Sequence, residues 1–303
     1  MVGYRCDMDA SSGDPIRRFA SWLVLSQIAM AASAAALVFA CSQVLERPIS
    51  PWWYPCAFLG SWAVYLRDSA ASCDAEDSIS QPRRAAIFRG STLWCVVLPM
   101  ISGALAVAFG LLARPSAETL VLLGVVGVLG LLHALPSSRN GRKKGFATKR
   151  FAAVKSIVVS IAWAVAAVGL PVLESGGDQN RSITMAAIWL AMLLVPLLLA
   201  DSLLLDLRDR LADRDFGLRT IAVRVGPRGI HALVGSLLGL GVMMILLGAS
   251  DAIDPIGWRR IGLAGCLGLF VTWLAWPILR RDEPGLAIAV MAWRFLAAVA
   301  TAT

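Results

Sequence analysis

The feature that most limits the fold of this chain is a series of nine long apolar runs within its 303 residues. Most approach the roughly 20 residues that an α-helix needs to cross the hydrocarbon core of a bilayer. They do not alternate in polarity, as the roughly ten-residue spans of a membrane β-barrel do. The runs therefore predict an all-α integral membrane protein with about nine transmembrane helices. They lie at 19–45, 52–66, 92–113, 118–136, 151–173, 183–205, 229–249, 260–279 and 285–302.

The composition excludes most other classes of protein. Hydrophobic residues make up 58% of the chain and charged residues only 16%, whereas ordinary soluble domains have roughly 45–50% and about 25%. The net charge of +8 does not indicate nucleic acid as a partner, since a basic excess in so apolar a chain is typical of cytoplasmic loops. We expect a cytoplasmic N-terminal tail at residues 1–18 and a single transmembrane domain at 19–303.

Lysine and arginine residues separate strongly between the two sides of this arrangement. If the N-terminus is cytoplasmic, 22 of the 28 Lys and Arg residues lie on its side. Cytoplasmic loops carry such an excess, so the sequence predicts a cytoplasmic N-terminus and a C-terminus on the opposite side, in a bacterial-type inner membrane. The opposite side receives only Arg47, Arg114, Arg181, Arg259 and Arg260, and Arg294 falls inside the ninth run.

Acidic residues gather at two points that this topology places on the cytoplasmic face. The positive-inside rule explains basic residues but not acidic ones, so these two groups need another cause. One follows the second run and contains Asp68, Asp74, Glu76 and Asp77. The other follows the sixth run and contains Asp201, Asp206, Asp209, Asp213 and Asp215.

If the sixth helix continues through the second acidic group, Asp206, Asp209 and Asp213 share one of its faces, because residues three and four apart are helical neighbours. Carboxylate oxygens suit hard cations, with Mg²⁺ the leading candidate. Only two histidines, His133 and His231, occur in the chain, which argues against a histidine-built metal site. The alternative is a solvated helix end, since arginines alternate with these aspartates and pairs at i,i+4 stabilise helices.

Residues 207–226 carry a longer pattern around these aspartates. It reads Leu-Arg-Asp-x-x-x-Asp-x-x-x-Gly-x-x-Thr-x-Ala-x-Arg-x-Gly. This pattern closely resembles the second aspartate-rich motif of the UbiA superfamily of intramembrane prenyltransferases, and it is nearest to the dihydroxynaphthoate (menaquinone) branch. The resemblance places Asp209 and Asp213 on the Asp pair of the family and Asp206 where that branch has Asn. It also implies a nine-helix UbiA-like bundle.

The first motif of the family, Asn-Asp-x-x-x-Asp, is incomplete at the end of the second run. Asp68 fits the motif, but Arg67 replaces the Asn and Ser72 occupies the position of the second Asp. On a continuous helix Asp77 would lie about 180° from Asp68, so it replaces Ser72 only if the helix has ended. Otherwise we expect Asp74, Glu76 and Asp77 to form a solvated acidic loop.

The resemblance also directs attention to the basic loop after the fourth run. Lys149, Arg150 and Lys155 lie where the family has a Tyr-plus-basic segment near its substrates, with His133 where a Tyr is expected. These three residues are candidates to bind a diphosphate. The alternative for each is a positive residue near anionic lipid headgroups.

The resemblance implies a catalytic activity. The expected reaction is Mg²⁺-dependent transfer of a prenyl group from a polyprenyl diphosphate to an aromatic or other lipophilic acceptor among the membrane lipids, in quinone or related lipid biosynthesis. Asp68, Asp209 and Asp213 would be catalytic, and these three with Asp206 would bind Mg²⁺, in a site on the cytoplasmic face. The alternative is a degenerate member that binds lipid or supports assembly. The motif of CDP-alcohol phosphotransferases is not found, and the internal repeats of a secondary transporter are not evident.

Overall fold

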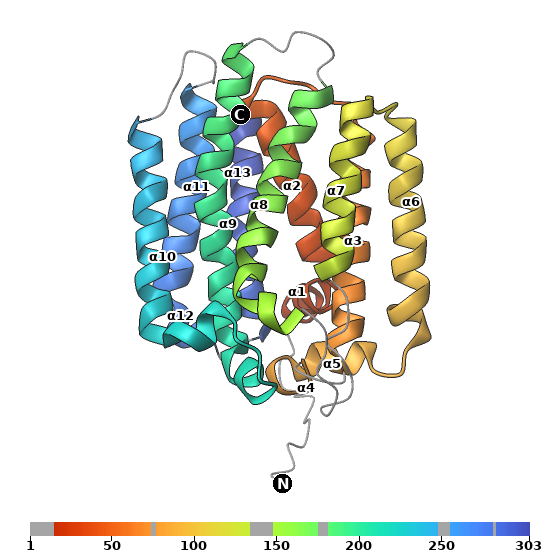
Figure 1. Cartoon of the computed structure of the whole chain (residues 1–303), viewed down its shortest axis with the longest axis vertical. Helices are drawn as coiled ribbons and strands as arrows, with labels where there is room; N and C mark the ends of the chain where they lie inside the picture. The colour runs from red at the N-terminus through yellow and green to blue at the C-terminus, as the bar shows by residue number, and fades with distance from the viewer. Residues whose placement is uncertain (1–14, 74–76, 134–147, 175–180, 248–254, 281–282) are drawn as a thin grey trace.

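The computed structural model describes residues 15–73, 77–133, 148–174, 181–247, 255–280 and 283–303. All regular elements within these ranges are helices, and the long ones lie side by side in a bundle (Figure 1). They are α1 (Pro15–Leu25), α2 (Ile28–Val44), α3 (Trp53–Ser72), α4 (Asp77–Ser80), α5 (Pro82–Phe88), the π-helical turn η1 (Leu93–Val97), α6 (Leu98–Leu112), α7 (Ala117–His133), α8 (Thr148–Glu174), α9 (Arg181–Asp215), α10 (Ile221–Leu247), α11 (Pro255–Leu274), α12 (Trp276–Leu279) and α13 (Glu283–Ala302).

Within the described residues, each of the nine apolar runs is largely helical. By length and apolar composition, five helices among the described residues are able to cross a membrane, or six if the bent pair α1–α2 is one span. Helix α7 contributes only a shorter apolar segment. The all-helical membrane architecture is therefore confirmed, whereas the count of nine spans is not.

The first run does not form the single helix that its apolar sequence predicts. It is divided into α1 and α2, which meet at an angle of 76°. Gln27 lies at the break with a left-handed φ of 64°, a conformation that is costly for a residue with a side chain. The indole Nε1 of Trp62 donates a 2.9 Å hydrogen bond to the carbonyl of Ser26, so α3 satisfies a backbone acceptor that the break releases.

Helix α9 lies at the centre of the core and packs against α8, α10, α11 and α13. Leu190, Leu193, Leu194 and Leu197 on α9 are fully buried. Large apolar side chains on the outer faces of α6, α7 and α10 are exposed instead. This is the inverse of a water-soluble surface and suits contact with lipid.

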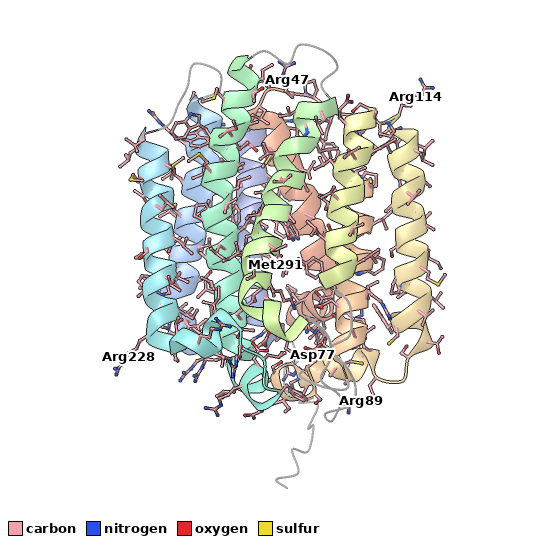
Figure 2. The ribbon with its side chains drawn as sticks, in the orientation of Figure 1. Arg47, Asp77, Arg89, Arg114, Arg228 and Met291 are labelled. Atoms are coloured by element: carbon pink, nitrogen blue, oxygen red, sulfur yellow. The ribbon has the colours of Figure 1, made fainter. Side chains whose placement is uncertain are left out.

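Figure 2 shows that arginines expected on opposite sides of the membrane lie at opposite ends of the bundle. Arg47 and Arg114 lie at one end, and Arg89 and Arg228 lie at the other together with Asp77. The short helices α4 and α5 are at the Asp77 end (Figure 1). The candidate site residues described below also lie at this end.

Candidate active site

Helix α9 continues without interruption to Asp215, so the condition for a shared face of aspartates is met. The structure nevertheless gives each carboxylate a different partner. The hydroxyl of Ser156 on α8 donates to Asp206. Asp209 accepts two 2.8 Å bonds from Nε and Nη2 of Arg208. The spacing along the helix is therefore as predicted, and Asp206 and Asp209 interact electrostatically although their hydrogen-bond partners differ.

Two further positions of the motif, Gly217 and Thr220, shape the end of α9. Gly217 takes a positive φ of 70°, and the amide of Leu218 donates to the carbonyl of Asp213 at 2.8 Å, which closes the helix with a glycine turn. The chain then returns, so that Thr220 Oγ1 donates to Asp213 Oδ2 at 3.0 Å. The Gly and Thr of the pattern thus hold the Asp213 carboxylate in place.

The first acidic group lies where one helix ends and the next begins. Helix α3 ends at Ser72, and Asp77 begins α4. The Ser72 hydroxyl donates to Asp77 Oδ2 at 2.6 Å, which places this carboxylate beside Ser72. Asp77 is only 3% exposed, so the interpretation as a solvated loop is wrong for this residue. Asp74 and Glu76, which shared that interpretation, lie outside the described residues.

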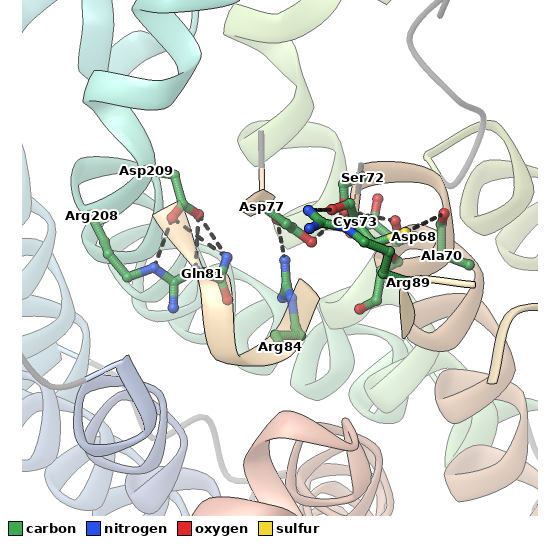
Figure 3. A network of polar contacts seen from close by, with 11 residues as sticks. Asp68, Ala70, Ser72, Cys73, Asp77, Gln81, Arg84, Arg89, Arg208 and Asp209 are labelled. Carbon is green, nitrogen blue, oxygen red and sulfur yellow. Dashed lines mark hydrogen bonds and ion pairs between the residues drawn. The ribbon is translucent and has the colours of Figure 1, made fainter. Parts of the chain in front are cut away.

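Arg84 on α5 pairs with the Asp77 carboxylate of the first acidic group (Figure 3). Its Nη2 lies 2.6 Å from Asp77 Oδ1, and it interacts electrostatically with Asp209 and Asp68 as well. Burial by itself would lower the pKa of Arg84, but the Asp77 carboxylate and its hydrogen bond raise that pKa above its ordinary value. The guanidinium therefore stays charged at the centre of three aspartates.

Gln81 provides a second link between the two groups. Its Nε2 lies 3.5 Å and 3.3 Å from the two carboxylate oxygens of Asp209. It directly precedes Pro82, which starts α5. Asp77, Gln81, Arg84 and Arg208 were not predicted as site residues. Asp77 had a signal in the sequence, the condition that α3 must end before it, and Arg208 had one as an arginine interleaved with the aspartates of α9.

The other residues predicted from the sequence differ in their exposure and in their contacts with the acidic groups. Asp68 is half-buried on α3, whereas Arg67 beside it is exposed. Lys155 on α8 is exposed and interacts electrostatically with Asp206, so the structure brings it to the second acidic group. The side chains of Lys149 and Arg150, as well as that of His133, lie outside the described residues.

Arg294 lies inside the bundle and has a partner that its sequence position does not reveal. It forms a buried ion pair with Asp201 on α9, donates to Ser33 Oγ on α2 at 3.0 Å, and lies 4.4 Å above the ring of Trp163 on α8. Asp201 had been grouped with the acids at the end of α9, but it is 1% exposed. It belongs to this pair, which joins four helices.

Comparison with known proteins identifies the fold and the family. Residues 76–299, about three quarters of the chain, match the UbiA prenyltransferase family. This chain belongs to the UbiA prenyltransferase family. The solved apo structure of a UbiA homologue from Aeropyrum pernix K1 has a similar fold, with a TM-score of 0.65 at 16% identity, covering 90% of this chain and 98% of that one. No curated protein matches the sequence significantly.

The family assignment predicted from residues 207–226 is therefore confirmed, and family membership implies an intramembrane prenyltransferase. The menaquinone branch is not confirmed by these comparisons. The matched region begins one residue before Asp77 and includes Gln81, Arg84 and the whole α9 motif, whereas Asp68 lies outside it. The match thus covers the residues that the structure links most directly.

UbiA enzymes generally use Mg²⁺ with a diphosphate substrate, and the donors of this UbiA-family chain suit that ion. Asp77 and Asp209 offer carboxylate oxygens of the kind that Mg²⁺ prefers, with substrate phosphates commonly completing the shell. Within the described parts of the chain, no three acidic, histidine or cysteine side chains are close enough to form a metal site by themselves. The chemistry therefore fits Mg²⁺, and the geometry requires further ligands.

Proposed function

We propose that this chain catalyses Mg²⁺-dependent transfer of a prenyl group from a polyprenyl diphosphate to a lipophilic, aromatic acceptor in the membrane. The observation that carries the proposal is the link between the two acidic groups. Gln81 and Arg84, on one short segment, contact Asp209 of the α9 motif and Asp77 beside Ser72. Two distant parts of the sequence thus meet at one end of an apolar bundle.

In this proposal Asp209, Asp213, Asp206 and Asp68 bind Mg²⁺, with Asp77 in the position that Ser72 leaves without a carboxylate. Held by these carboxylates, Mg²⁺ would supply positive charge that stabilises the departing diphosphate. Asp209 lies beside Arg208, so anionic and cationic groups are interleaved, as a site for both a cation and a diphosphate requires.

The protein residues position the reactants and exclude water. The bundle interior accommodates the prenyl chain, while Lys155, with Lys149 and Arg150 before it on α8, contacts the diphosphate at the polar end. The allylic carbon–oxygen bond breaks, pyrophosphate leaves with the bonding electron pair, and the acceptor carbon forms the new bond and loses a proton. The products are a prenylated lipid and pyrophosphate.

We place the Asp77 end of the bundle at the cytoplasmic face of a bacterial-type inner membrane, with the C-terminus on the opposite side. The excess of Lys and Arg in the loops at this end supports that orientation. The α9 motif, nearest to the dihydroxynaphthoate branch, supports a quinone precursor as the acceptor.

The alternative is a UbiA-family protein that binds lipid or supports assembly without catalysis. Its support is the incomplete first motif, with Arg67 and Ser72 at two of its positions. The contact between Ser72 and the buried Asp77 carboxylate favours the enzyme instead, because it returns an acidic group to the place where one is missing.

The deciding experiment incubates the purified protein in nanodiscs with labelled geranylgeranyl diphosphate, Mg²⁺ and a panel of aromatic acceptors. We expect a prenylated product with the native chain and none with the double variant Asp209→Ala/Asp213→Ala. Asp215→Ala is the matched control, since Asp215 is on the same helix with its side chain 58% exposed. Full activity in the double variant would contradict the assignment, and binding without turnover by the native chain would support the alternative.

A further inference from the structure

Arg84 and Arg208 border the same small cavity. The cavity has a volume of about 50 Å³ and lies between the α1–α2 break, α5, α9 and α13. Apart from Gln27, Gln81 and the two arginines, its walls are apolar, with side chains that include Val24, Met30, Leu205 and Met291. None of the residues that line it carries a carboxylate. Among the described residues, the carboxylates that pair with the two guanidinium groups, Asp77 and Asp209, lie outside this lining.

In the structure each guanidinium forms an ion pair with a site carboxylate (Figure 3). Arg208 binds both oxygens of Asp209 at 2.8 Å, and Arg84 binds Asp77 at 2.6 Å. The Arg84 and Arg208 side chains are 14% and 10% exposed. A buried charge that loses its partner is strongly unfavourable, so in the absence of ligand the carboxylates hold these arginines in place.

Mg²⁺ competes with the arginines for the same carboxylate oxygens. Both oxygens of Asp209 already accept hydrogen bonds from Arg208, and Gln81 approaches them as well. A divalent cation beside this carboxylate also repels the guanidinium at hydrogen-bonding distance. Metal binding therefore requires the arginines to find another anion, and the bordering cavity gives their side chains room to turn in an otherwise packed interior.

We propose that Arg84 and Arg208 are exchangeable counter-ions, which pair with Asp77 and Asp209 in the empty site and transfer to the diphosphate when Mg²⁺ takes those carboxylates. This inference rests on the proposed function and adds a coupling between its two ligands. Guanidinium groups form bidentate hydrogen bonds with phosphate oxygens, as they do with carboxylates. Because the cavity lining offers no anion, the exchange is complete only when metal and diphosphate are both bound. Each ligand thus strengthens binding of the other.

The first test measures diphosphate binding without metal. Farnesyl diphosphate is titrated in EDTA into the full chain in nanodiscs. We expect the isosteric Asp209→Asn variant to bind it about tenfold more tightly than the native chain, because a charge-assisted contact no longer restrains Arg208. The gain should disappear in Asp209→Asn/Arg208→Gln. The control Asp215→Asn, which changes an exposed pair with Arg214 at 3.8 Å, should bind as the native chain does.

The second test measures metal binding without diphosphate, with Mn²⁺ as the probe and electron paramagnetic resonance as the readout. We expect Arg208→Gln to raise Mn²⁺ affinity about tenfold, since the carboxylate loses its competitor, and Arg214→Gln to leave it unchanged. A merely structural arginine would lower metal affinity or leave it as it was.

An unchanged or reduced affinity in either Asp209→Asn or Arg208→Gln would overturn the exchange. Neither test depends on turnover, so its result is separate from that of the transfer assay. A chain without transferase activity that shows both gains keeps this proposal and loses the proposed function. A chain that transfers prenyl groups but shows neither gain in affinity keeps the proposed function and loses the exchange of counter-ions.

Discussion

The two acidic regions of this protein reach the same end of the bundle by different routes. On α9 a continuous helix carries Asp206, Asp209 and Asp213 at intervals of three and four residues. In the first region α3 ends at Ser72, and Asp77 at the start of α4 contacts that serine. Regular spacing in the sequence identifies carboxylates that share one helix, but it does not identify a carboxylate that begins a separate helix, as Asp77 does.

The two regions also differ in how strongly their carboxylates are built into the fold. Asp77 is buried and paired with the buried Arg84 of another helix. The Asp209 side chain is 24% exposed, and its Arg208 partner is the preceding residue on the same helix. We therefore expect Asp77 to matter for both stability and activity, whereas Asp209 should matter mainly for activity.

The largest effect is expected for Asp77→Ala, which leaves the Arg84 guanidinium buried without its closest partner. Removing one member of a buried pair costs about 3–5 kcal/mol, and transferase activity should be lost as well. Thermal unfolding in detergent measures the first effect and the prenyl transfer assay the second. A variant as stable as the native chain would show that Asp77 and Asp209 play equivalent roles.

Asp209→Ala should lower transfer by about 10²–10³-fold, the usual cost of one group that stabilises developing charge. Its unfolding temperature should fall less than that of Asp77→Ala, because the Asp209 side chain is 24% exposed and water can replace part of its contact with Arg208, whereas the Asp77 side chain is 4% exposed. The assay compares initial rates at saturating Mg²⁺. A large loss of stability in Asp209→Ala would contradict the expected difference between the two acidic regions.

A smaller effect is expected when the hydroxyl that positions a carboxylate is removed from each region. Thr220→Val removes the bond to Asp213, and Ser72→Ala removes the bond to Asp77. Each hydrogen bond to a charged group is worth about 1.5–3 kcal/mol, so initial rates should fall by about tenfold or more. Recovery of the rate in Thr220→Ser would confirm that the hydroxyl is responsible, while a normal rate in Thr220→Val would refute its positioning role.

The smallest effect is expected for Arg214→Gln, which removes an exposed pair with Asp215 on α9. Such pairs contribute about 0–1 kcal/mol, so thermal unfolding and transfer should remain near native values. A marked loss of activity would extend the site along α9 beyond the residues that face Gln81 and Arg84.

Features carried by a single helix were predictable from the sequence. The continuation of α9 through the acidic group and the family resemblance both follow from residues 207–226, and the comparisons confirm the family. The break at Gln27 was not predictable, because nothing in the apolar composition of 19–45 marks it. Its geometry depends on the hydrogen bond from Trp62, a residue of another helix.

The sequence by itself determined a helical membrane protein and the spacing of the α9 aspartates, because apolar length and helical periodicity are properties of neighbouring residues. Only the tertiary structure decided which charges meet. Arg294 pairs with Asp201 over 93 positions, and Gln81 contacts Asp209 over 128. These contacts arise from helix packing and from turns, and within an apolar bundle a buried charge must find its partner wherever packing places one.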